Sequence, residues 1–522
     1  MNLAELLEIA ASMFPEREFI RFEGNAISYE RFQERVARVA GAFIGLGVEP
    51  GDRVAVLQTN TPAVIEAMYA TAMLGAVFVP LNYRARESEL AHMIGVARPR
   101  ALLLGDRYVE AAREVTARLT HSPTMVSIES RVDGLPLFDD LVDAGEPAIP
   151  EEIYEDELAV LMFTSGTTAA PKGVMLAHAD LTNYVMASVD PGDETIDECV
   201  LIAAPLYHIA GLTAALTATF AGRRVVLMRQ FEAEEWLRLG AGERVTHAFL
   251  VPTMLRRVVD HESFATTDLS ALRVLSYGAA PMPLGLIRRA IECFPPAVGF
   301  INAFGQTETT STVSVLGPDD HRLDGTPGEV EIKLKRLSSI GRALPDVEIR
   351  ITDEQGEPVA PGEVGEIAIR TVRTMRGYYE QESATAATIR DGWVLTRDLG
   401  WIDEDGYIYL SGRKSDMIIR GGENIAPDEI EAVLESHPDV EEVGVIGIPD
   451  EEWGERVGAV VVARPGATVS EEALIEHCRQ RLASFKKPEV MIFVDALPRN
   501  AMGKVLRNEL RARHASTAQV EG

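Results

Sequence analysis

Short apolar runs alternate with longer amphipathic segments along roughly the first 300 residues, and this rhythm restricts the fold more than any other feature of the chain. Parallel strands need helix-length connections, whereas antiparallel strands can be joined by turns of two residues. The spacing therefore predicts mostly parallel α/β sheets with helices on their faces. The apolar runs that we expect to form strands lie at 54–57, 77–81, 101–105, 158–163, 200–205, 223–228, 247–252, 272–278 and 298–305.

The texture of the sequence changes after about residue 328. Shorter apolar runs, such as those at 347–351 and 365–370, are separated by turn sequences such as DEQGEP and DEDG. This pattern predicts a small antiparallel or barrel-like subdomain at about 328–412. We therefore expect a large N-terminal domain that covers residues 1–412 and includes this β-rich subdomain.

A polar segment flanked by glycine, SGRKSDMIIRGG at 411–422, marks the expected start of a small C-terminal domain at 413–522. The patterns in this domain predict an α+β sandwich. We expect, in order, a helix at 427–436, strands at 443–448 and 457–463, a helix at 470–484 and a strand at 490–494. The fold class is thus α/β, with mostly parallel sheets, a β-rich subdomain and a mobile α+β C-terminal domain.

Charge and cysteine content exclude several classes of function. The chain has 50 Lys and Arg against 80 Asp and Glu, a formal net charge of −30. This field repels polyanions, so we expect neither a nucleic acid nor an anionic membrane surface as a partner. Cys199, Cys293 and Cys478 are far apart, which predicts no disulfide framework and no zinc site and fits a reducing cytoplasm. A bound small anion would need local cations, a metal ion or backbone N–H groups.

Two segments bear on export and on membrane insertion. The acidic N-terminus lacks a basic start, so it predicts an amphipathic helix and not a signal peptide. The residues of this helix expected to point inward are Leu3, Leu6, Leu7, Ala10 and Phe14. Residues 199–222 carry no charge over 24 positions, which is long enough to span a bilayer. Because Pro205 and Gly211 interrupt this segment, it predicts a buried strand, a turn and a buried helix, without stable membrane insertion.

The segment FTSGTTAAPKG at 163–173 directly follows a predicted buried strand. Glycine and small hydroxylated residues allow several backbone N–H groups and hydroxyls to face one anion, and Lys172 adds a positive charge. The segment is not a Walker A loop, because Pro171 and Gly173 stand where that pattern requires Gly before the lysine and Ser or Thr after it. It is a candidate phosphate loop, although an ordinary surface turn would explain its composition equally well.

Four further motifs follow this loop in the chain. They are YGAAPMP at 277–283, NAFGQTETT at 302–310, the long segment TRDLGWIDEDGYIYLSGRKSDMIIRGGENIAPDEIE at 396–431, and PRNAMGKVLR at 498–507. All five, in this order, resemble the motifs of the adenylate-forming superfamily, which includes AMP-forming acyl-CoA synthetases, luciferases and the adenylation domains of peptide synthetases. The resemblance covers nearly the whole chain.

The resemblance implies catalytic roles for four residues. Lys504 would approach the carboxylate and the leaving pyrophosphate, where a positive charge offsets the charge that develops. Glu308 and Thr164 would help to hold Mg²⁺, which prefers oxygen ligands. His208 would lie beside the acyl pocket. Considered alone, Lys504 would be a solvent-facing lysine, Glu308 a solvated side chain at a turn, and His208 a core histidine.

The resemblance also implies a nucleotide site. Phe304 would pack on the adenine, Thr307 would lie near the α-phosphate, Asp398 would accept the ribose hydroxyls, and Arg413 would reach ribose and phosphate. Without the motif, Asp398 would be an ordinary turn acceptor. The other residues expected to contact ATP or coenzyme A are Ser165, Gly166, Thr167, Thr168, Lys172, Gly278, Ala279, Ala280, Asn302, Ala303, Gly305, Gly421 and Gly422.

The implied reaction is the ATP-dependent ligation of a carboxylic acid to coenzyme A. The carboxylate would attack the α-phosphate to form an acyl-adenylate and pyrophosphate, and the thiolate of coenzyme A would then displace AMP. The C-terminal domain would rotate about Ser415 between the two steps. Two positions depart from the family pattern: Ala169 replaces a loop glycine, which costs about 1 kcal/mol if that position needs φ > 0, and Ser415 replaces the usual Asp or Lys at the hinge.

The acid itself is predicted less directly. The runs expected to line its pocket, at 207–213, 249–254, 277–280 and 302–311, contain no Arg or Lys, which favours a hydrophobic acyl tail. Our first expectation is a medium- or long-chain fatty acid, and our second is an aromatic or alicyclic acid. The sequence leaves open an enzyme that loads a carrier protein in trans, a nucleotide-binding protein without turnover, and a luciferase-like oxygenase, and it allows a homodimer.

Overall fold

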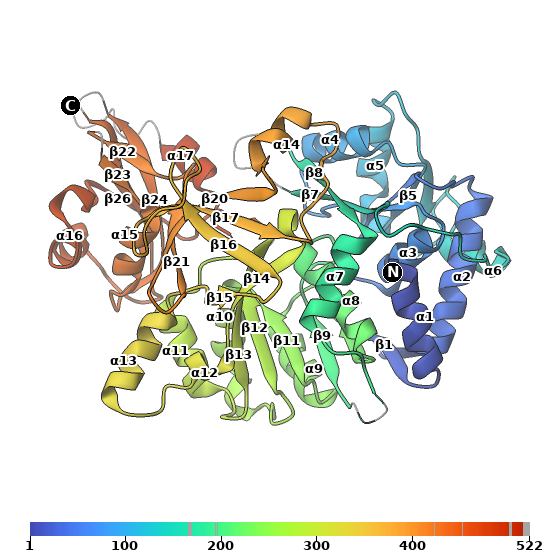
Figure 1. The fold of residues 1–522 in the computed structure, drawn as a ribbon, viewed down its shortest axis with the longest axis horizontal. Helices are drawn as coiled ribbons and strands as arrows, with labels where there is room; N and C mark the ends of the chain where they lie inside the picture. Colours follow the sequence, from blue (N-terminus) through green and yellow to red (C-terminus); the bar gives the residue numbers. More distant parts are fainter. Residues whose placement is uncertain are drawn as a thin grey trace.

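A computed structural model describes residues 1–164, 170–193, 195, 197–421, 423–450, 453–500 and 504–514. In these residues the strands form four sheets, with helices between and around them (Figure 1). Two large sheets belong to the N-terminal part, a smaller antiparallel sheet follows, and the fourth sheet lies in the C-terminal part, drawn in orange and red. The predicted fold class is confirmed: a large α/β domain, a β-rich region and a small C-terminal domain.

The first large sheet has seven strands. In spatial order they are β18 (Gly377–Tyr378), β8 (Lys172–Ala177), β7 (Leu158–Thr164), β4 (Val77–Pro80), β3 (Arg53–Leu57), β5 (Ala101–Leu104) and β6 (Thr124–Ser127). Neighbours from β7 to β6 pair in parallel, whereas β8 and β18 are antiparallel additions at one edge. The four apolar runs predicted in this region all form strands, to within one residue at each end.

The second large sheet has nine strands. In spatial order they are β15 (Arg342–Ala343), β14 (Ser311–Leu316), β13 (Gly299–Gln306), β12 (Val274–Gly278), β11 (His247–Leu250), β9 (Cys199–Ile202), β10 (Arg224–Leu227), β1 (Glu18–Phe22) and β2 (Asn25–Ser28). The strands from β13 to β1 are parallel, and the remaining pairs are antiparallel. All five runs predicted here form strands.

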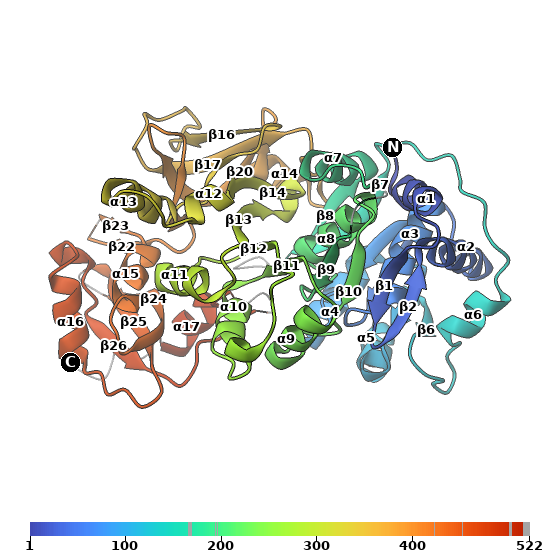
Figure 2. The same cartoon turned by 90° about the horizontal axis from the view of Figure 1, so that it is seen from below.

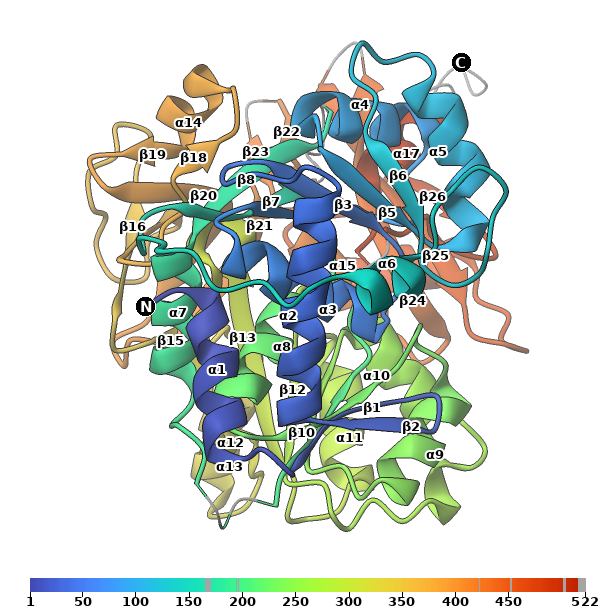
Figure 3. The same cartoon turned by 90° about the vertical axis from the view of Figure 1, so that its right-hand side faces the viewer.

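Helices fill the space between the two sheets and cover their outer faces (Figures 2 and 3). In β3, Val54 and Val56 join the cluster between the sheets, while Ala55 and Leu57 join the cluster on the outer face. The strand is therefore buried on both faces, as expected for a parallel sheet. The inner helices are α1 (Leu3–Met13), α2 (Tyr29–Gly45), α3 (Pro62–Met73), α6 (Phe138–Ala144), α7 (His178–Ser188) and α8 (Ile209–Phe220); the outer ones are α4 (Glu87–Ala97), α5 (Val109–Thr116), α9 (Ala233–Gly242), α10 (Pro252–Val259) and α11 (Leu284–Cys293).

The two segments that bear on membranes behave as the sequence predicts. α1 and its C-cap residue Phe14 bury the five predicted apolar residues against the inner core. The uncharged segment 199–222 forms β9, a turn and α8, which lies in the layer between the two sheets. Among the described residues, every helix is too short or too polar to cross a bilayer.

The β-rich region begins later than the sequence predicts. Helix α12 (Pro318–His321) precedes the predicted start of this region. Residues 327–336 then form helix α13 instead of a strand, because Thr326 and Glu329 make a capping box and Pro327 occupies the first turn. The antiparallel sheet that follows contains β16 (Val347–Thr352), β17 (Gly365–Thr371), β20 (Trp393–Ile402), β19 (Ile389–Arg390) and β21 (Ile408–Arg413). Helix α14 (Glu382–Thr388) lies between β18 and β19 in the chain.

The C-terminal residues form a sheet with helices on both faces. Its strands are β23 (Glu423–Ile425), β22 (Ile418–Arg420), β25 (Gly454–Ala463), β24 (Val440–Asp450) and β26 (Val490–Phe493). Helices α15 (Pro427–Glu435) and α16 (Glu471–Arg479) pack on one face, and α17 (Arg507–His514) packs on the other. The predicted helix at 470–484 ends early: Leu482 and Phe485 keep the apolar spacing but reach the core through a turn and a short 3₁₀ helix at 484–486.

We predict that Gly305→Ala destabilises the protein, because β13 and β14 approach each other too closely for a side chain there. An added Cβ would lie 1.7 Å from the Ser311 carbonyl oxygen, which is backbone and cannot rotate away. Overpacking of this kind costs about 1–3 kcal/mol, which should lower the thermal unfolding midpoint of so large a domain by about 1–3 °C. Gly285→Ala in α11, where nothing lies within 4 Å of the added Cβ, should leave the midpoint unchanged or raise it. Equal midpoints for the two variants would contradict this account.

Candidate active site

The site lies where several distant segments meet. In parallel sheets the loops after the carboxyl ends of the strands share one edge, and α/β proteins usually bind ligands there. β12 and β13 end at Gly278 and Gln306, and the short 3₁₀ helix η3 (Thr307–Thr309) follows. The β7–β8 hairpin and the bulged β20–β21 pair supply further walls, and Lys504 reaches the site from the C-terminal domain.

The candidate phosphate loop connects β7 and β8. Thr164 and Lys172 pair directly across the two strands, so they flank the loop at its two ends. Burial lowers the pKa of Lys172, the positive charge of Arg397 lowers it further, and Glu308 opposes this change. These three charges are therefore neighbours. The predicted contacts at Ser165, Gly166, Thr167 and Thr168, and the departure at Ala169, lie outside the described residues.

Tyr378 joins two of the predicted site residues. Its hydroxyl donates a hydrogen bond to Oε1 of Glu308 at 2.8 Å, and the ammonium of Lys172 lies 4.6 Å from the centre of its ring. The ring therefore offers Lys172 a cation–π contact. Burial and the charge of Glu308 raise the pKa of Tyr378, so the hydroxyl keeps its proton and remains a donor. The backbone N–H of Met375 also donates to the Glu308 carbonyl at 2.9 Å.

The backbone around β12 and β13 is tightly packed and strained. An added Cβ at Gly278 would lie 2.1 Å from the carbonyl oxygen of Ala303 on the neighbouring strand. Ala279, which Ala280 follows, has φ of +66° in the left-handed region, where a non-glycine residue is unfavourable. Ser311 and Arg397 share this feature with φ of +74° and +63°. Such strain clusters at functional sites, and here it surrounds the predicted motifs.

Asp398, Arg413 and Lys504 form a charge cluster in which Asp398 is buried and the two cations are half-buried. Arg413 Nε lies 2.8 Å from Asp398 Oδ1, across the β20–β21 pair. Burial raises the pKa of Asp398, and the charges of Arg413 and Lys504 oppose this rise. Burial also lowers the pKa of Lys504 to about 8, with Arg413 lowering it further and Asp398 raising it. The structure therefore brings the predicted lysine of the C-terminal domain to the predicted ribose-binding carboxylate.

His208 is neutral and fixed in orientation. It precedes α8, and its Nδ1 accepts a hydrogen bond from the Ala210 N–H at 3.3 Å. Burial lowers the pKa of His208 to about 4. Because Nδ1 accepts, the proton of the neutral ring is on Nε2.

Three other predicted residues lie on β13 or directly after it. The side-chain amide of Asn302 donates to the Ser339 carbonyl at 3.1 Å. Phe304 is half-buried and packs against the core of the β-rich region. Thr307 is buried in η3 beside Glu308.

The predicted coenzyme A contact at Gly421 lies elsewhere. Its N–H donates to the Trp453 carbonyl at 2.8 Å, within the C-terminal domain, and its φ is +58°. Gly422 lies outside the described residues. In this arrangement of the two domains, Lys504 and not Gly421 is the C-terminal residue found beside Asp398.

A cavity of about 180 Å³ lies between the nine-stranded sheet and helices α7 and α8. Near the strand ends its wall contains Ala204, Ala303 and Ser311. The lining of this cavity also includes Arg223 and His247, which lie outside the runs expected to form the acid pocket. The motif-based runs sample only the carboxyl ends of the strands, and the cavity continues toward their amino ends.

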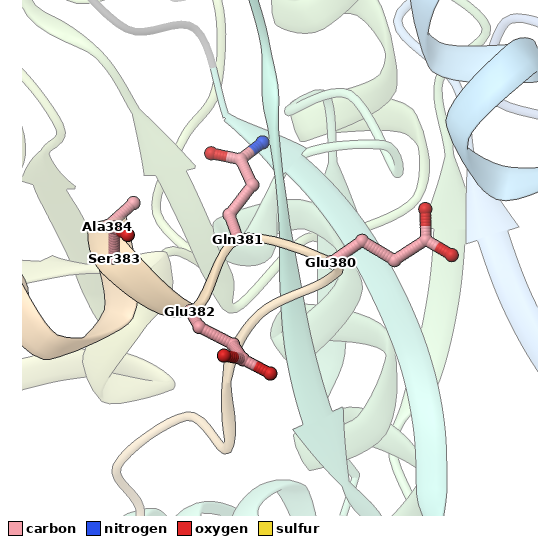
Figure 4. Close-up of a pocket in the computed structure, with 5 residues that line it drawn as sticks. All are labelled: Glu380, Gln381, Glu382, Ser383 and Ala384. Atoms are coloured by element: carbon pink, nitrogen blue, oxygen red, sulfur yellow. The ribbon is translucent and has the colours of Figure 1, made fainter.

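A second hollow, of about 450 Å³, lies on the loop between β18 and α14. The side chains of Glu380, Gln381 and Glu382 that line it point in different directions (Figure 4). Glu380 forms an ion pair with Arg98. The polar groups that line this hollow do not converge on one point, so it does not resemble a binding site.

Sequence reasoning missed Tyr378, Arg397, Arg223 and His247. Arg397 stands beside Asp398 inside a quoted motif, so its position was a usable signal. Tyr378, Arg223 and His247 lie outside the recognised motifs, and only the packing of distant strands brings them to the site or the cavity.

Comparison with known proteins gives consistent results. Residues 7–379 match the AMP-binding enzyme family, and residues 429–504 match the AMP-binding enzyme C-terminal domain. Feruloyl-CoA synthase of Amycolatopsis sp is 37% identical over 506 residues, which are 96% of this chain and 97% of that protein. Indoleacetate–CoA ligase of Aromatoleum aromaticum is 34% identical over 98% of both chains. The crystal structure of ATP-bound MatB from Rhodopseudomonas palustris is similar with a TM-score of 0.88 and 30% identity, over 99% of this chain and 100% of that one.

The layered α/β domain, the β-rich sheet and the C-terminal domain that delivers a lysine to the site define an adenylate-forming enzyme. The chain belongs to the AMP-binding enzyme family, and within it the protein is an acid–thiol ligase.

We predict that Tyr378→Phe weakens the use of ATP. The change keeps the ring beneath Lys172 but removes the hydroxyl that holds Glu308, and a hydrogen bond to a charged group is worth about 1.5–3 kcal/mol. The KM for ATP should rise about tenfold or more, with a thermal midpoint within about 2 °C of the parent. Tyr379→Phe is the matched control, because that hydroxyl bonds Arg98 instead. An unchanged KM in Tyr378→Phe, or an equal rise in both variants, would contradict the assignment.

Proposed function

We propose that the enzyme ligates an aromatic carboxylic acid to coenzyme A, through an acyl-adenylate and with release of AMP and pyrophosphate. The observation that supports the adenylation chemistry is the cluster of Asp398, Arg413 and Lys504, which lies in the site together with the group of Lys172 and Glu308. In the first step, carboxylate and triphosphate repel each other. Lys504 would offset this repulsion, and Arg413 would orient the nucleotide held by Asp398.

The phosphate side of the site fits a magnesium ion. Tyr378 occupies one oxygen of the Glu308 carboxylate, and Thr164 supplies a hydroxyl at the end of β7. Mg²⁺ is usually bound by one or two carboxylates together with phosphate oxygens and water. Glu308 and Thr164 would hold the ion, whose charge would be balanced against the phosphates. Among the described residues there is no cluster of three or more acidic, His or Cys ligands that would hold a metal without the nucleotide.

The second step would require the C-terminal domain to move. In the present arrangement Lys504 is beside Asp398, while Gly421 packs on Trp453. Ser415 lies in the connection between β21 and β22, where the Asp416 N–H donates to the Arg413 carbonyl at 2.9 Å. We propose that rotation about Ser415 withdraws Lys504 and presents the Gly421 segment to coenzyme A. The domain division at residues 412 and 413 is part of this proposal.

An aromatic acid is supported better than the fatty acid that we expected first. Feruloyl-CoA synthase and indoleacetate–CoA ligase are named for aromatic acids and align over nearly the whole chain. The cavity between α8 and the sheet measures about 180 Å³. A cavity of about 150 Å³ holds benzene, so one ring with a short side chain suits this volume. We therefore propose that this cavity holds the acid.

A panel of acids tests the proposal. We predict that arylacrylic and arylacetic acids give at least tenfold higher kcat/KM than fatty acids of 8 to 16 carbons, measured as pyrophosphate release with ATP, Mg²⁺ and coenzyme A. A tenfold difference corresponds to about 1.4 kcal/mol on the barrier. A preference for the fatty acids would overturn the aromatic assignment. Thioester formed on a phosphopantetheinyl carrier protein but not on free coenzyme A would favour a carrier-loading enzyme.

The pH dependence tests the role of Lys504. The lysine stabilises negative charge only when protonated, and burial lowers its pKa to about 8. We predict that kcat/KM for adenylation, which reports the free enzyme, falls as the pH rises through about 8, approaching tenfold per pH unit above it. Lys504→Arg should remove this fall, because arginine stays protonated. The same alkaline fall in the Lys504→Arg variant would assign it to another group.

Lys504→Ala supplies the control for this prediction. It should abolish adenylation while leaving coenzyme A transfer from a presynthesised acyl-adenylate within about threefold, because Lys504 acts only in the first step. Equal losses in the two half-reactions would show a general structural effect.

A further inference from the structure

The cavity between α8 and the nine-stranded sheet has two ends, and separate elements define them. Along β9 and the residues after it, the wall runs from Val200 to Ala204, about 13 Å at the rise of a strand. Along α8 it runs from Ala210 to Ala218, about 12 Å at the rise of a helix. The two wall lengths agree, which indicates that the cavity is elongated along β9 and α8.

The register of the sheet orients this cavity. His247 of β11 pairs with Val200 and Val274. Phe249 pairs with Ser276 two residues further along, nearer the carboxyl ends of the strands, where the motifs lie. One end therefore lies at the carboxyl ends of the strands, beside the predicted site. The other lies at their amino ends, and we call it the distal end; it is lined by Val200, Ala218, Arg223, His247 and Val274.

The distal end is polar. Arg223 Nε donates to Glu198 Oε2 at 2.7 Å, and His247 Nε2 lies 4.0 Å from the same oxygen. Within the part of the chain that the structure describes, the two terminal nitrogens of Arg223 have no hydrogen-bond partner. Burial lowers the pKa of His247 to about 4, so its ring is neutral at pH 7.

This chemistry distinguishes between kinds of acid. A wholly apolar tail would end against an ion pair and leave its donors without a partner, which is costly. A distal carboxylate would meet the charge of Glu198, and a distal ammonium would meet that of Arg223. A hydroxyl suits both groups, because it accepts from a guanidinium and also donates to a carboxylate or a neutral imidazole.

We propose that the distal end is a subsite for a hydroxyl group at the far end of the substrate acid, so that the enzyme selects hydroxyaryl carboxylic acids. Arg223 is then a residue that determines specificity, and Glu198 holds its side chain in place. This inference rests on the proposed function, because it takes the cavity as the site of the acid. It adds a polar contact that none of the sequence motifs contains.

Two acids that differ by one hydroxyl test the proposal. The parent enzyme should use 4-hydroxycinnamate with at least tenfold higher kcat/KM than cinnamate, because a site built to bond a hydroxyl rejects the analogue that lacks it. Arg223→Met keeps the length of the side chain and removes its donors. It should lower this ratio to about one to two, mainly through a higher KM for 4-hydroxycinnamate.

Arg224→Met is the matched control. Arg224 is the next residue and forms an ion pair with Glu243 at 2.6 Å, but it does not line the cavity. Its loss should leave the ratio unchanged. If Arg223→Met does not fold, Arg223→Lys serves instead, because it keeps the charge but loses the paired donors of the guanidinium. It should still lower the ratio of kcat/KM for 4-hydroxycinnamate over cinnamate at least threefold. Equal losses for both acids in the Arg223 variants would identify the ion pair as merely structural and overturn the proposal.

A second comparison separates this proposal from the proposed function. If fatty acids prove to be the better substrates, the aromatic assignment fails, and ω-hydroxy fatty acids are then compared with unmodified ones of equal length. A tenfold preference for the hydroxylated chain that Arg223→Met removes would still support the subsite. Equal use of both chains would overturn it, as would a preference for 4-carboxycinnamate over 4-hydroxycinnamate.

Discussion

The arrangement of the site depends on the ion pair between the buried Asp398 and the half-buried Arg413. A charged pair taken out of water is stable only when its geometry is good and further partners support it. Here Asp398 lies on β20 and Arg413 on β21, and this bulged strand pair holds Arg413 Nε 2.8 Å from Asp398 Oδ1. The charge of Lys504 also lowers the pKa of Asp398, against the effect of burial. The same cluster links the β-rich sheet to the C-terminal domain, so local electrostatics and domain arrangement are coupled.

A net charge of −30 makes such a cluster necessary. The general field of the protein opposes the approach of a triphosphate, and screening weakens that field only beyond about 8–10 Å. Local cations must therefore lie close to the anion. Lys172 lies near Arg397, and Lys504 lies near Arg413. Both lysines have lowered pKa values because burial and a neighbouring arginine disfavour their charge, so each gains when an anion enters.

The sequence predicted most strands because parallel sheets bury both faces of each strand, and this produces the continuous apolar runs that were recognised. It predicted Glu308, Asp398, Arg413 and Lys504 through motifs, and the structure brings these together in two groups. It did not predict Tyr378, whose partners lie 70 and more residues away. It placed the β-rich region too early because the capping box at Thr326 starts a helix where the texture suggested strands. Contacts between distant segments and short helix signals leave little trace in local patterns.

The lining of the cavity shows why motifs predict the reaction better than the substrate. The motifs sit at the carboxyl ends of the strands, where the adenylation chemistry common to the family would take place, whereas the cavity extends about four residues back along β9 to Val200. Residues at the amino ends, such as Arg223 and His247, can change without disturbing the nucleotide site. The runs expected from the motifs therefore favoured a mostly apolar pocket, with a fatty acid as the first expectation. With an ion pair at the distal end of the cavity, the far end of the acid is the part that we propose the enzyme distinguishes.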